Sequence, residues 1–234
     1  MDKTDITNPA SHSLFDFGTV AQDYDRWYLT PEGRAYDRTQ KMDVLTLLPR
    51  AQPGERLLDV GCGTGHWSKF FGSLGYDVVG VDISERMIEV AESHRPPNCI
   101  FQVADACRLP FQGHSFNIVT AMATLGFVSD VSQVLEEMFR CVQENGVVLV
   151  GVLNRLAHVN QKRLTANREP YVSGRLFSRK DLYDLLRQRG HVRMVGSVPK
   201  TTGYGKRFWR SMVHWMGLED SRFEAPFIVA EVRR

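Results

Sequence analysis

The sequence predicts a doubly wound α/β domain, in which helices cover both faces of a mainly parallel sheet. Short apolar runs of strand type alternate with amphipathic segments of helix length from residue 56 onward. Such an alternation is typical of βαβ units. The 234 residues, 43% of them hydrophobic and 24% charged, suit one globular domain with an additional part.

The order of the predicted elements follows the apolar pattern. Apolar positions at helical spacing predict the helices, and continuous apolar runs of four to eight residues predict buried strands. In chain order the elements are a helix over 35–48, a strand over 56–60, a helix over 66–74, a strand over 77–84, a helix over 85–95, strands over 99–105 and 116–123, a helix over 131–142, a strand over 147–153, a helix over 179–190, and strands over 192–198 and 227–232.

Capping and stop residues set the helix boundaries in the first half. Pro49 ends the first helix, and Gly75 ends the second. Ser84 is the predicted N-cap of the third helix, which ends before the two prolines at 96 and 97.

Turn and capping signals also mark the second half. Asn145 and Gly146 predict a tight turn between the helix over 131–142 and the next strand. Ser178 and Asp181 have the spacing of a capping box, and Gly190 ends the helix that follows them.

Charge is distributed unevenly along the chain. Residues 1–150 contain 12 Lys/Arg and 20 Asp/Glu, a net charge of −8, whereas residues 151–234 contain 17 and 7, a net charge of +10. The total of +2 does not by itself predict a nucleic-acid or membrane partner. Since no apolar run is long enough to span a bilayer and the first residues lack the apolar part of a secretory signal, we expect a cytoplasmic protein.

The four cysteines predict neither disulfides nor a metal site. Cys62, Cys99, Cys107 and Cys141 have no CxxC spacing and no accompanying histidine pattern. We therefore expect reduced thiols and no bound metal.

A glycine turn after the first strand predicts a nucleoside-containing ligand. Gly61, Gly63 and Gly65 follow the strand over 56–60 directly and precede a helix. Glycine permits a positive φ and a close approach of a ligand to the backbone. Asp82 ends the next strand 21 residues after Gly61, where a carboxylate can accept both hydroxyls of a ribose.

Three details argue against a dinucleotide. His66 stands where the dinucleotide fingerprint has its last glycine. Asp59, inside the strand, disfavours a pyrophosphate and suits a cationic ligand such as a sulfonium. Asp105 ends the third strand, where it can hold an adenine amino group. A nicotinamide-dependent oxidoreductase is therefore the weakest alternative.

These segments resemble class I S-adenosylmethionine (SAM)-dependent methyltransferases. LLDVGCGTG, VVGVDIS, VADACRLPF, FNIVTAMATLGFV and VLEEMFRCVQENGVVLVGVLN occur in the order of that family over about residues 15–155. The chain is similar to the branch of ubiquinone/menaquinone-biosynthesis methyltransferases and related small-molecule enzymes. The resemblance implies a Rossmann-like sheet of seven strands with the last one antiparallel. The chain departs from the family pattern at Asn117, where the family usually has an acid, and at Glu144-Asn145-Gly146, where it usually has Pro-Gly-Gly.

The resemblance also implies roles for individual residues, with SAM as the cofactor. They are Tyr24 facing the cofactor, Asp59 and Gly61, Cys62, Gly63 and Gly65 near the methionine part, Asp82 on the ribose hydroxyls, Ile83 and Met87 beside the adenine, Asp105 and Ala106 on its edge, and Ala121 and Met122 flanking the sulfonium.

The resemblance further implies a single domain over 1–234 with three parts. These are an N-terminal lid and helix in 1–50, a cofactor-binding core in 51–155, and a basic substrate cap with the last strands in 156–234.

Methyl transfer from a sulfonium is an in-line displacement that depends mainly on positioning. The sequence assigns no catalytic residue. Candidate substrate contacts are Tyr28 in the aromatic-rich N-terminal stretch, His66 at the helix start, and Asn154 and His158 after the fifth strand. The structural alternatives are aromatic cover for the sheet, a helix-start residue, and solvated loop residues.

The acceptor is expected to be a small molecule, and the basic last third suggests an anionic one. The alternatives are an RNA-directed methyltransferase and a catalytically inactive cofactor-binding partner subunit. The fourth strand lacks the Asn/Asp-Pro-Pro-Tyr/Phe tetrapeptide of amino-methylating nucleic-acid enzymes, which makes nucleic acid the weaker choice. Within 203–220, Phe208, Met212 and Trp215 at helical spacing suit packing, a membrane surface or RNA. The oligomeric state is not predicted.

Overall fold

The computed structural model describes residues 12–199 and 224–233. Its elements are η2 (Phe17–Val20), α1 (Arg26–Leu29), α2 (Pro31–Leu47), β1 (Arg56–Val60), α3 (His66–Ser73), β2 (Asp77–Asp82), α4 (Glu85–Ser93), β3 (Cys99–Val103), β4 (Phe116–Met122), α5 (Val131–Cys141), β5 (Val142–Leu153), α6 (His158–Thr165), α7 (Arg179–Leu186), β6 (His191–Val195) and β7 (Phe227–Arg233).

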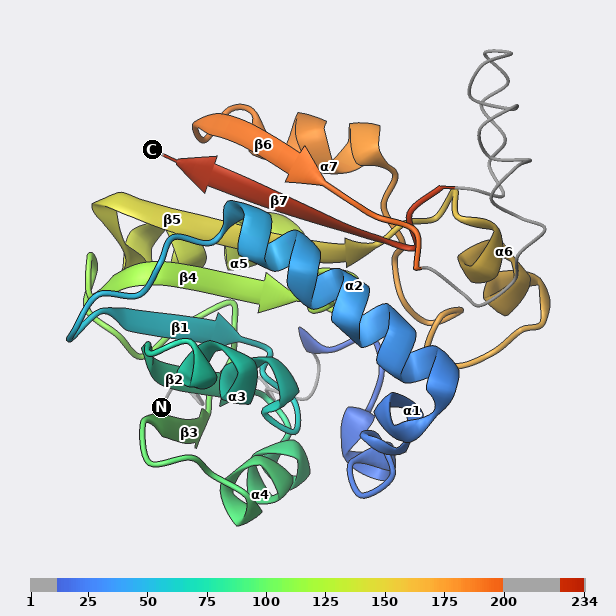
Figure 1. Cartoon of the computed structure of the whole chain (residues 1–234), viewed down its shortest axis with the longest axis horizontal. Coiled ribbons are helices and arrows are strands. Elements are labelled where there is room, and N and C mark those ends of the chain that lie inside the picture. Colours follow the sequence, from blue (N-terminus) through green and yellow to red (C-terminus); the bar gives the residue numbers. More distant parts are fainter. Residues whose placement is uncertain (1–11, 200–223, 234) are drawn as a thin grey trace, which may run out of the picture.

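The strands form one seven-stranded sheet in the order β3-β2-β1-β4-β5-β7-β6 (Figure 1). The first five strands, β1 to β5, are parallel to one another. β7 runs antiparallel between β5 and β6. The predicted doubly wound α/β class with an antiparallel last strand is therefore confirmed.

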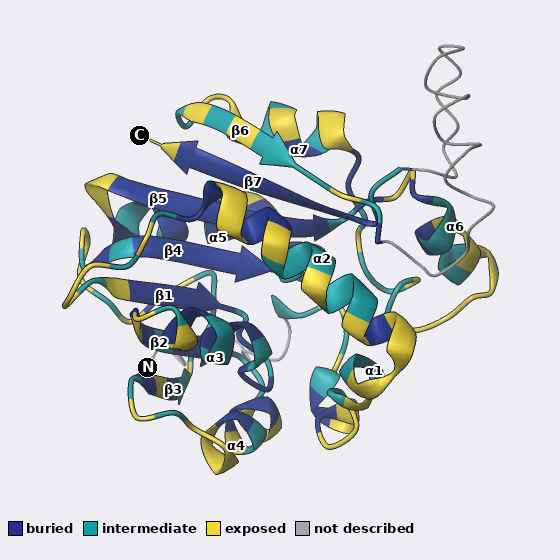
Figure 2. Cartoon of the chain, viewed as in Figure 1, coloured by how far each residue is buried: buried dark blue, intermediate teal, exposed yellow. Residues whose placement is uncertain are grey.

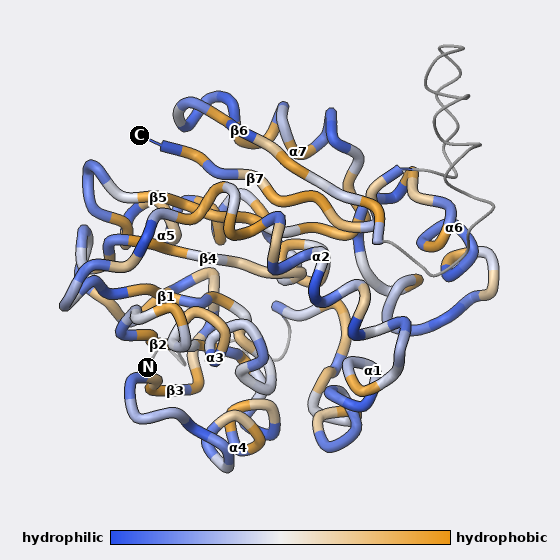
Figure 3. Tube along the Cα trace, in the orientation of Figure 1, coloured by the Kyte–Doolittle hydropathy of each residue, from blue (hydrophilic) through white to orange (hydrophobic). Residues whose placement is uncertain are grey.

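Two apolar clusters, one on each face of the sheet, form the core. Side chains of α2, α3 and α4 pack on one face, against residues such as Leu57 of β1. Side chains of α5 and α7 pack on the other face, where Leu58 of the same strand points. This alternation follows from the two-residue period of a strand. Figure 2 shows the central strands almost entirely buried, and Figure 3 shows the same strands as the most apolar part of the trace.

The predicted turn at Asn145 and Gly146 is wrong, because both residues lie inside β5. The β4–β5 register shifts there: Phe116 pairs with Val142, and Ile118 pairs with Val147. A Cβ on Gly146 would lie 2.6 Å from the carbonyl oxygen of Asn117. Glycine is thus needed for a close backbone approach at a strand irregularity rather than for a turn.

Other boundaries also differ from the prediction. The first long helix begins at Pro31, with Thr30 as the N-cap that accepts from Gly33 N. The capping box at Ser178 is confirmed, but its helix ends at Leu186 instead of Gly190. The short helix α6 was not predicted. The segment 203–220 lies outside the described residues, so its predicted amphipathic helix stays a prediction.

None of the helices in 12–199 and 224–233 is long and apolar enough to cross a membrane.

Candidate functional site

A cavity of about 510 Å³ opens at the carboxyl ends of the first strands. This edge of an open α/β sheet is where ligands bind in such folds. The cavity includes eight of the predicted cofactor residues: Tyr24, Gly61, Gly63, Asp82, Ile83, Met87, and Asp105 and Ala106 in the loop after β3. The structure therefore brings together residues that lie as far apart in the sequence as 24 and 106.

The glycine turn forms one wall of the cavity. Gly61, Gly63 and Gly65 have φ values of 68°, 54° and 79°, in the left-handed region that favours glycine. A Cβ on Gly61 would lie 2.2 Å from Cγ2 of Thr124, whose hydroxyl donates to the carbonyl of Val60 (2.9 Å). The turn is therefore packed tightly on the segment that follows β4.

Asp82 lines the cavity and is held by the backbone. Its Oδ2 accepts from Gly63 N and its Oδ1 from Ser84 N, both at 2.9 Å. Burial raises the pKa of this carboxyl, and the backbone hydrogen bonds oppose the shift. Because each carboxylate oxygen can accept more than one hydrogen bond, both remain able to accept from a ligand.

Asp59 does not line this cavity. It is buried, and its two oxygens accept from Ser68 Oγ (2.6 Å) and Thr120 Oγ1 (2.9 Å). Burial raises the pKa of Asp59 to about 6. The carboxyl therefore joins α3 to β4 beneath the glycine turn.

Four further predicted cofactor residues are absent from the cavity lining. Cys62, Ala121 and Met122 are buried in the core, and Gly65 packs against Phe101. Their cofactor contacts, like that of Asp59, stay predictions.

The N-terminal stretch covers the cavity. Residues His12 to Gly18 contribute to its lining, together with Tyr24. Two backbone hydrogen bonds, from Leu14 N to Phe127 O (2.7 Å) and from Ser129 N to His12 O (2.9 Å), fasten this stretch to the segment after β4. Burial raises the pKa of the Tyr24 phenol well above its ordinary value.

Contacts with the glycine turn and the start of α3 hold the N-terminal helices α1 and α2. Thr64 Oγ1 donates to Asp25 Oδ1 (2.8 Å), and His66 Nε2 lies 2.6 Å from Asp37 Oδ1. The ring of Tyr28 stacks on the imidazole of His66. The two predicted substrate residues Tyr28 and His66 are therefore in direct contact.

The other two predicted substrate residues have different surroundings. Asn154 is 2% exposed, and its Nδ2 donates to the carbonyl of Ala225 (2.9 Å) and to Glu224 Oε2 (3.0 Å). It therefore ties the end of β5 to the segment before β7. His158 is half-buried at the start of α6 and does not line the cavity.

Sequence reasoning missed several residues of the site. His12, Thr124 and Phe127 line the cavity, and Asp37 contacts His66. Asp37 lies four residues before Lys41 and forms an ion pair with it (2.8 Å). This spacing is the one local signal in the sequence that could have drawn attention to Asp37. The positions of His12 and Phe127 depend on tertiary contacts.

The strand order and the glycine turn at the cavity define a Rossmann-like fold, a class in which ligands bind at the carboxyl edge of the sheet. Residues 58–150 match a family model described as a methyltransferase domain. These residues, about two fifths of the chain, are therefore similar to methyltransferase domains.

Curated relatives match part of the chain. A demethylmenaquinone methyltransferase of Renibacterium salmoninarum is 39% identical over 135 residues, which are 57% of this chain and 55% of the relative. A ubiquinone biosynthesis O-methyltransferase of Sinorhizobium fredii is 34% identical over 110 residues, 46% of this chain and 44% of the relative. The chain thus spans about half the length of these relatives.

Solved structures share the fold over nearly the whole chain. A SAM-dependent methyltransferase of Thermotoga maritima has a TM-score of 0.70 at 24% identity, covering 93% of this chain and 97% of that one. A phosphoethanolamine N-methyltransferase of Haemonchus contortus in complex with SAM has a TM-score of 0.61 at 17% identity, covering 94% and 60%. These likenesses confirm the fold.

Proposed function

We propose that this protein transfers a methyl group from SAM to a small-molecule acceptor by in-line displacement. The observation that carries the proposal is the position of Asp82. Its carboxylate is anchored by the glycine turn and lines a cavity that also contains the predicted adenine contacts. The methyltransferase domain and the names of its relatives support the same reaction class.

The cavity fits the nucleoside part of such a cofactor. Its volume of about 510 Å³ lies within the range of roughly 300–1,000 Å³ typical of ligand sites. Gly63 leaves open space at the turn, since a Cβ there would meet one atom, Met87 Sδ, at 4.0 Å. Asp82 would accept from the ribose hydroxyls, and Ile83 and Met87 would contact the adenine. SAM supplies the electrophilic methyl group on its sulfonium.

The residues of this chain would act mainly by positioning. The N-terminal stretch lines one side of the cavity and would shield a bound cofactor from water, which strengthens electrostatic interactions there. Tyr24 lines the cavity, and burial favours the neutral form of its phenol, so it would donate or accept a hydrogen bond without carrying charge. His66, held by Asp37 and Tyr28, is the candidate polar contact for the acceptor.

An anionic acceptor is part of this proposal. The net charge of +10 in residues 151–234 favours it. Arg163 of α6 lies over the rings of Trp27 (6.0 Å to the centroid) and Tyr171 (4.7 Å), and Nη1 donates to Asn160 Oδ1 (3.0 Å). Among the described residues no carboxylate pairs with Arg163, so its charge is available to an anion.

Two measurements test the proposed function. Isothermal titration calorimetry should show micromolar binding of SAM and of its demethylated product, S-adenosylhomocysteine (SAH). Methyl incorporation from radiolabelled SAM should occur with members of a panel of small quinols, phenols and carboxylates, and not with RNA. Binding of NAD without SAM would overturn the proposal. Tight SAM binding with no turnover on the panel would favour a partner subunit, and salt-dependent RNA methylation would favour the nucleic-acid alternative.

A further inference from the structure

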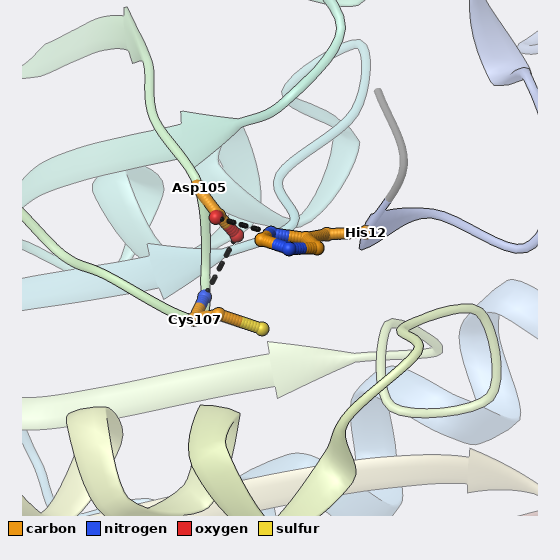
Figure 4. Close-up of side chains that lie close together, drawn as sticks. All are labelled: His12, Asp105 and Cys107. Atoms are coloured by element: carbon orange, nitrogen blue, oxygen red, sulfur yellow. Dashed lines mark hydrogen bonds and ion pairs between the residues drawn. The ribbon is translucent and has the colours of Figure 1, made fainter. Parts of the chain in front are cut away.

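Three side chains of metal-binding type meet at one end of the cavity. A nitrogen of His12, a carboxylate oxygen of Asp105 and the sulfur of Cys107 all lie within 4.8 Å of one another (Figure 4). We propose that these residues bind a transition-metal ion such as Zn²⁺, and that the ion and the cofactor exclude one another. The metal site itself does not depend on the proposed function, whereas the antagonism does.

The donor set selects the class of metal. Imidazole nitrogen and thiolate sulfur are ligands for Zn²⁺ and Co²⁺, whereas Mg²⁺ and Ca²⁺ prefer oxygen. With metal–ligand distances of about 2.0–2.3 Å, ligand atoms of a tetrahedral site lie about 3.5 Å apart. His12 Nδ1 and Asp105 Oδ2 are already 2.6 Å apart. Small side-chain rotations would bring the three ligand atoms to tetrahedral spacing, and a water would occupy the fourth position.

Each of the three residues is oriented by a hydrogen bond of its own. The carbonyl of His12 accepts from Ser129 N (2.9 Å). The second carboxylate oxygen of Asp105 accepts from Cys107 N (2.9 Å), and the carbonyl of Cys107 accepts from Gln133 Nε2 (3.3 Å). Such outer contacts hold ligands in place and raise metal affinity. Two separate segments, the N-terminal stretch and the loop after β3, therefore present the ligands to a common point.

Metal binding would release a proton from the Cys107 thiol. The metal–sulfur bond would replace the S–H bond, and the proton would pass to solvent.

The same residues lie where the adenine is expected. Asp105 lines the cavity and is the predicted contact of the adenine edge. An ion bound to this carboxylate would make it unavailable as a hydrogen-bond acceptor for the adenine amino group. It would also hold His12, and with it the N-terminal stretch, in its present position beside the cavity. Under the proposed function, metal binding should weaken cofactor binding.

Cobalt provides a spectroscopic test of the metal site. Co²⁺ is titrated into the tag-free full chain after reduction and removal of metals by a chelator. The expected result is one equivalent of Co²⁺ with a thiolate-to-cobalt charge-transfer band, which Zn²⁺ displaces. Cys107→Ser should abolish the band, and His12→Ala should weaken Co²⁺ binding at least tenfold.

Two control variants should keep the parent behaviour. Cys141→Ala changes another thiol, and His94→Ala changes an exposed histidine whose ring contacts Ser93. Thermal unfolding of all four variants checks that each is folded. Absence of saturable Co²⁺ binding in the parent, or an unchanged band in folded Cys107→Ser, would overturn the site.

A competition experiment tests the antagonism. The affinity for SAH is measured with and without Zn²⁺ at ten times its dissociation constant. We expect SAH affinity to fall at least tenfold in the parent and to stay unchanged in Cys107→Ser. Equal SAH affinities in the parent with and without Zn²⁺ would overturn the antagonism. If the parent binds no SAH at all, the proposed function fails, while the Co²⁺ titration still decides the metal site.

Discussion

The imidazole of His66 lies parallel to the phenol ring of Tyr28, with the ring centroids 3.8 Å apart and the planes at 4°. Tyr28 belongs to α1, and His66 begins α3 directly after the glycine turn. The stacked pair therefore fastens the N-terminal helices to the loop that is proposed to hold the cofactor. Together with the hydrogen bond from Thr64 to Asp25, it holds α1 against the glycine turn.

Removal of the stacked ring should loosen this attachment. We expect Tyr28→Ala to lower the free energy of unfolding by about 1–3 kcal/mol and to increase protease cleavage before α2, because the aromatic contact and its buried area are lost. Tyr28→Phe keeps the stack and is the matched control. Urea unfolding and limited proteolysis measure the two effects. Equal behaviour of the two variants would show that the stack contributes nothing.

Substitution of Gly61 carries two energetic costs, one from its positive φ and one from its close contact with Thr124, and a second glycine allows them to be measured separately. Gly54 and Gly61 both have positive φ, but a Cβ on Gly54 would meet nothing within 4 Å. Gly54→Ala should therefore cost about 1 kcal/mol, and Gly61→Ala should cost at least about 3 kcal/mol. Adding Thr124→Ala to Gly61→Ala should recover part of the loss. Similar unfolding free energies for the two glycine variants would contradict this explanation.

The ribose assignment predicts a specific loss of affinity. Asp82→Asn should weaken SAH binding at least tenfold in calorimetry, because an amide offers one acceptor oxygen where the carboxylate offers two charged ones. Asp77→Asn, at the exposed start of the same strand, should bind SAH as the parent does. If Asp82→Asn binds SAH as tightly as Asp77→Asn, the ribose contact lies elsewhere.

The buried carboxyl of Asp59 predicts a pH dependence of stability. Its pKa is about 6 in the folded protein and about 3.9 in an unfolded chain. Between these values the folded state holds a proton that the unfolded state releases, so the free energy of unfolding falls as the pH rises. The loss is present in full above pH 6.

The side chain of Asp59→Asn cannot ionise. The free energy of unfolding of this variant, minus that of the parent, should therefore increase by about 2 kcal/mol when the pH is raised from 4.5 to 7.5. Urea unfolding of both proteins at the two pH values measures this difference. Burial also raises the pKa of Asp82, but that residue is common to both proteins and cancels. A difference in stability that does not change with pH would contradict the buried, ionisable state of Asp59.

Local signals predicted the order and type of most strands and the glycine turn. The strands are continuous apolar runs because both faces of the sheet are covered, and such runs are visible in a sequence. The turn predicted at Asn145 and Gly146 failed because the same dipeptide also suits a strand irregularity, which depends on the neighbouring strand.

The missed parts of the site are long-range contacts. Asp37 with His66, Asp25 with Thr64 and His12 with Asp105 join residues separated by 29, 39 and 93 positions. No periodicity relates such residues. The fold decides these contacts by placing the N-terminal stretch over the carboxyl edge of the sheet, and a single sequence does not show that placement.

The position of β7 between β5 and β6 has a consequence for synthesis on the ribosome. β6 is synthesised before β7, but it joins the sheet only by pairing with β7. Until residues 227–233 have been made, β5 therefore has an unpaired edge and β6 has no partner strand. Unpaired edges are templates for pairing with other chains. A truncation before residue 227 should therefore aggregate during expression, even though every residue that lines the proposed cofactor cavity is present.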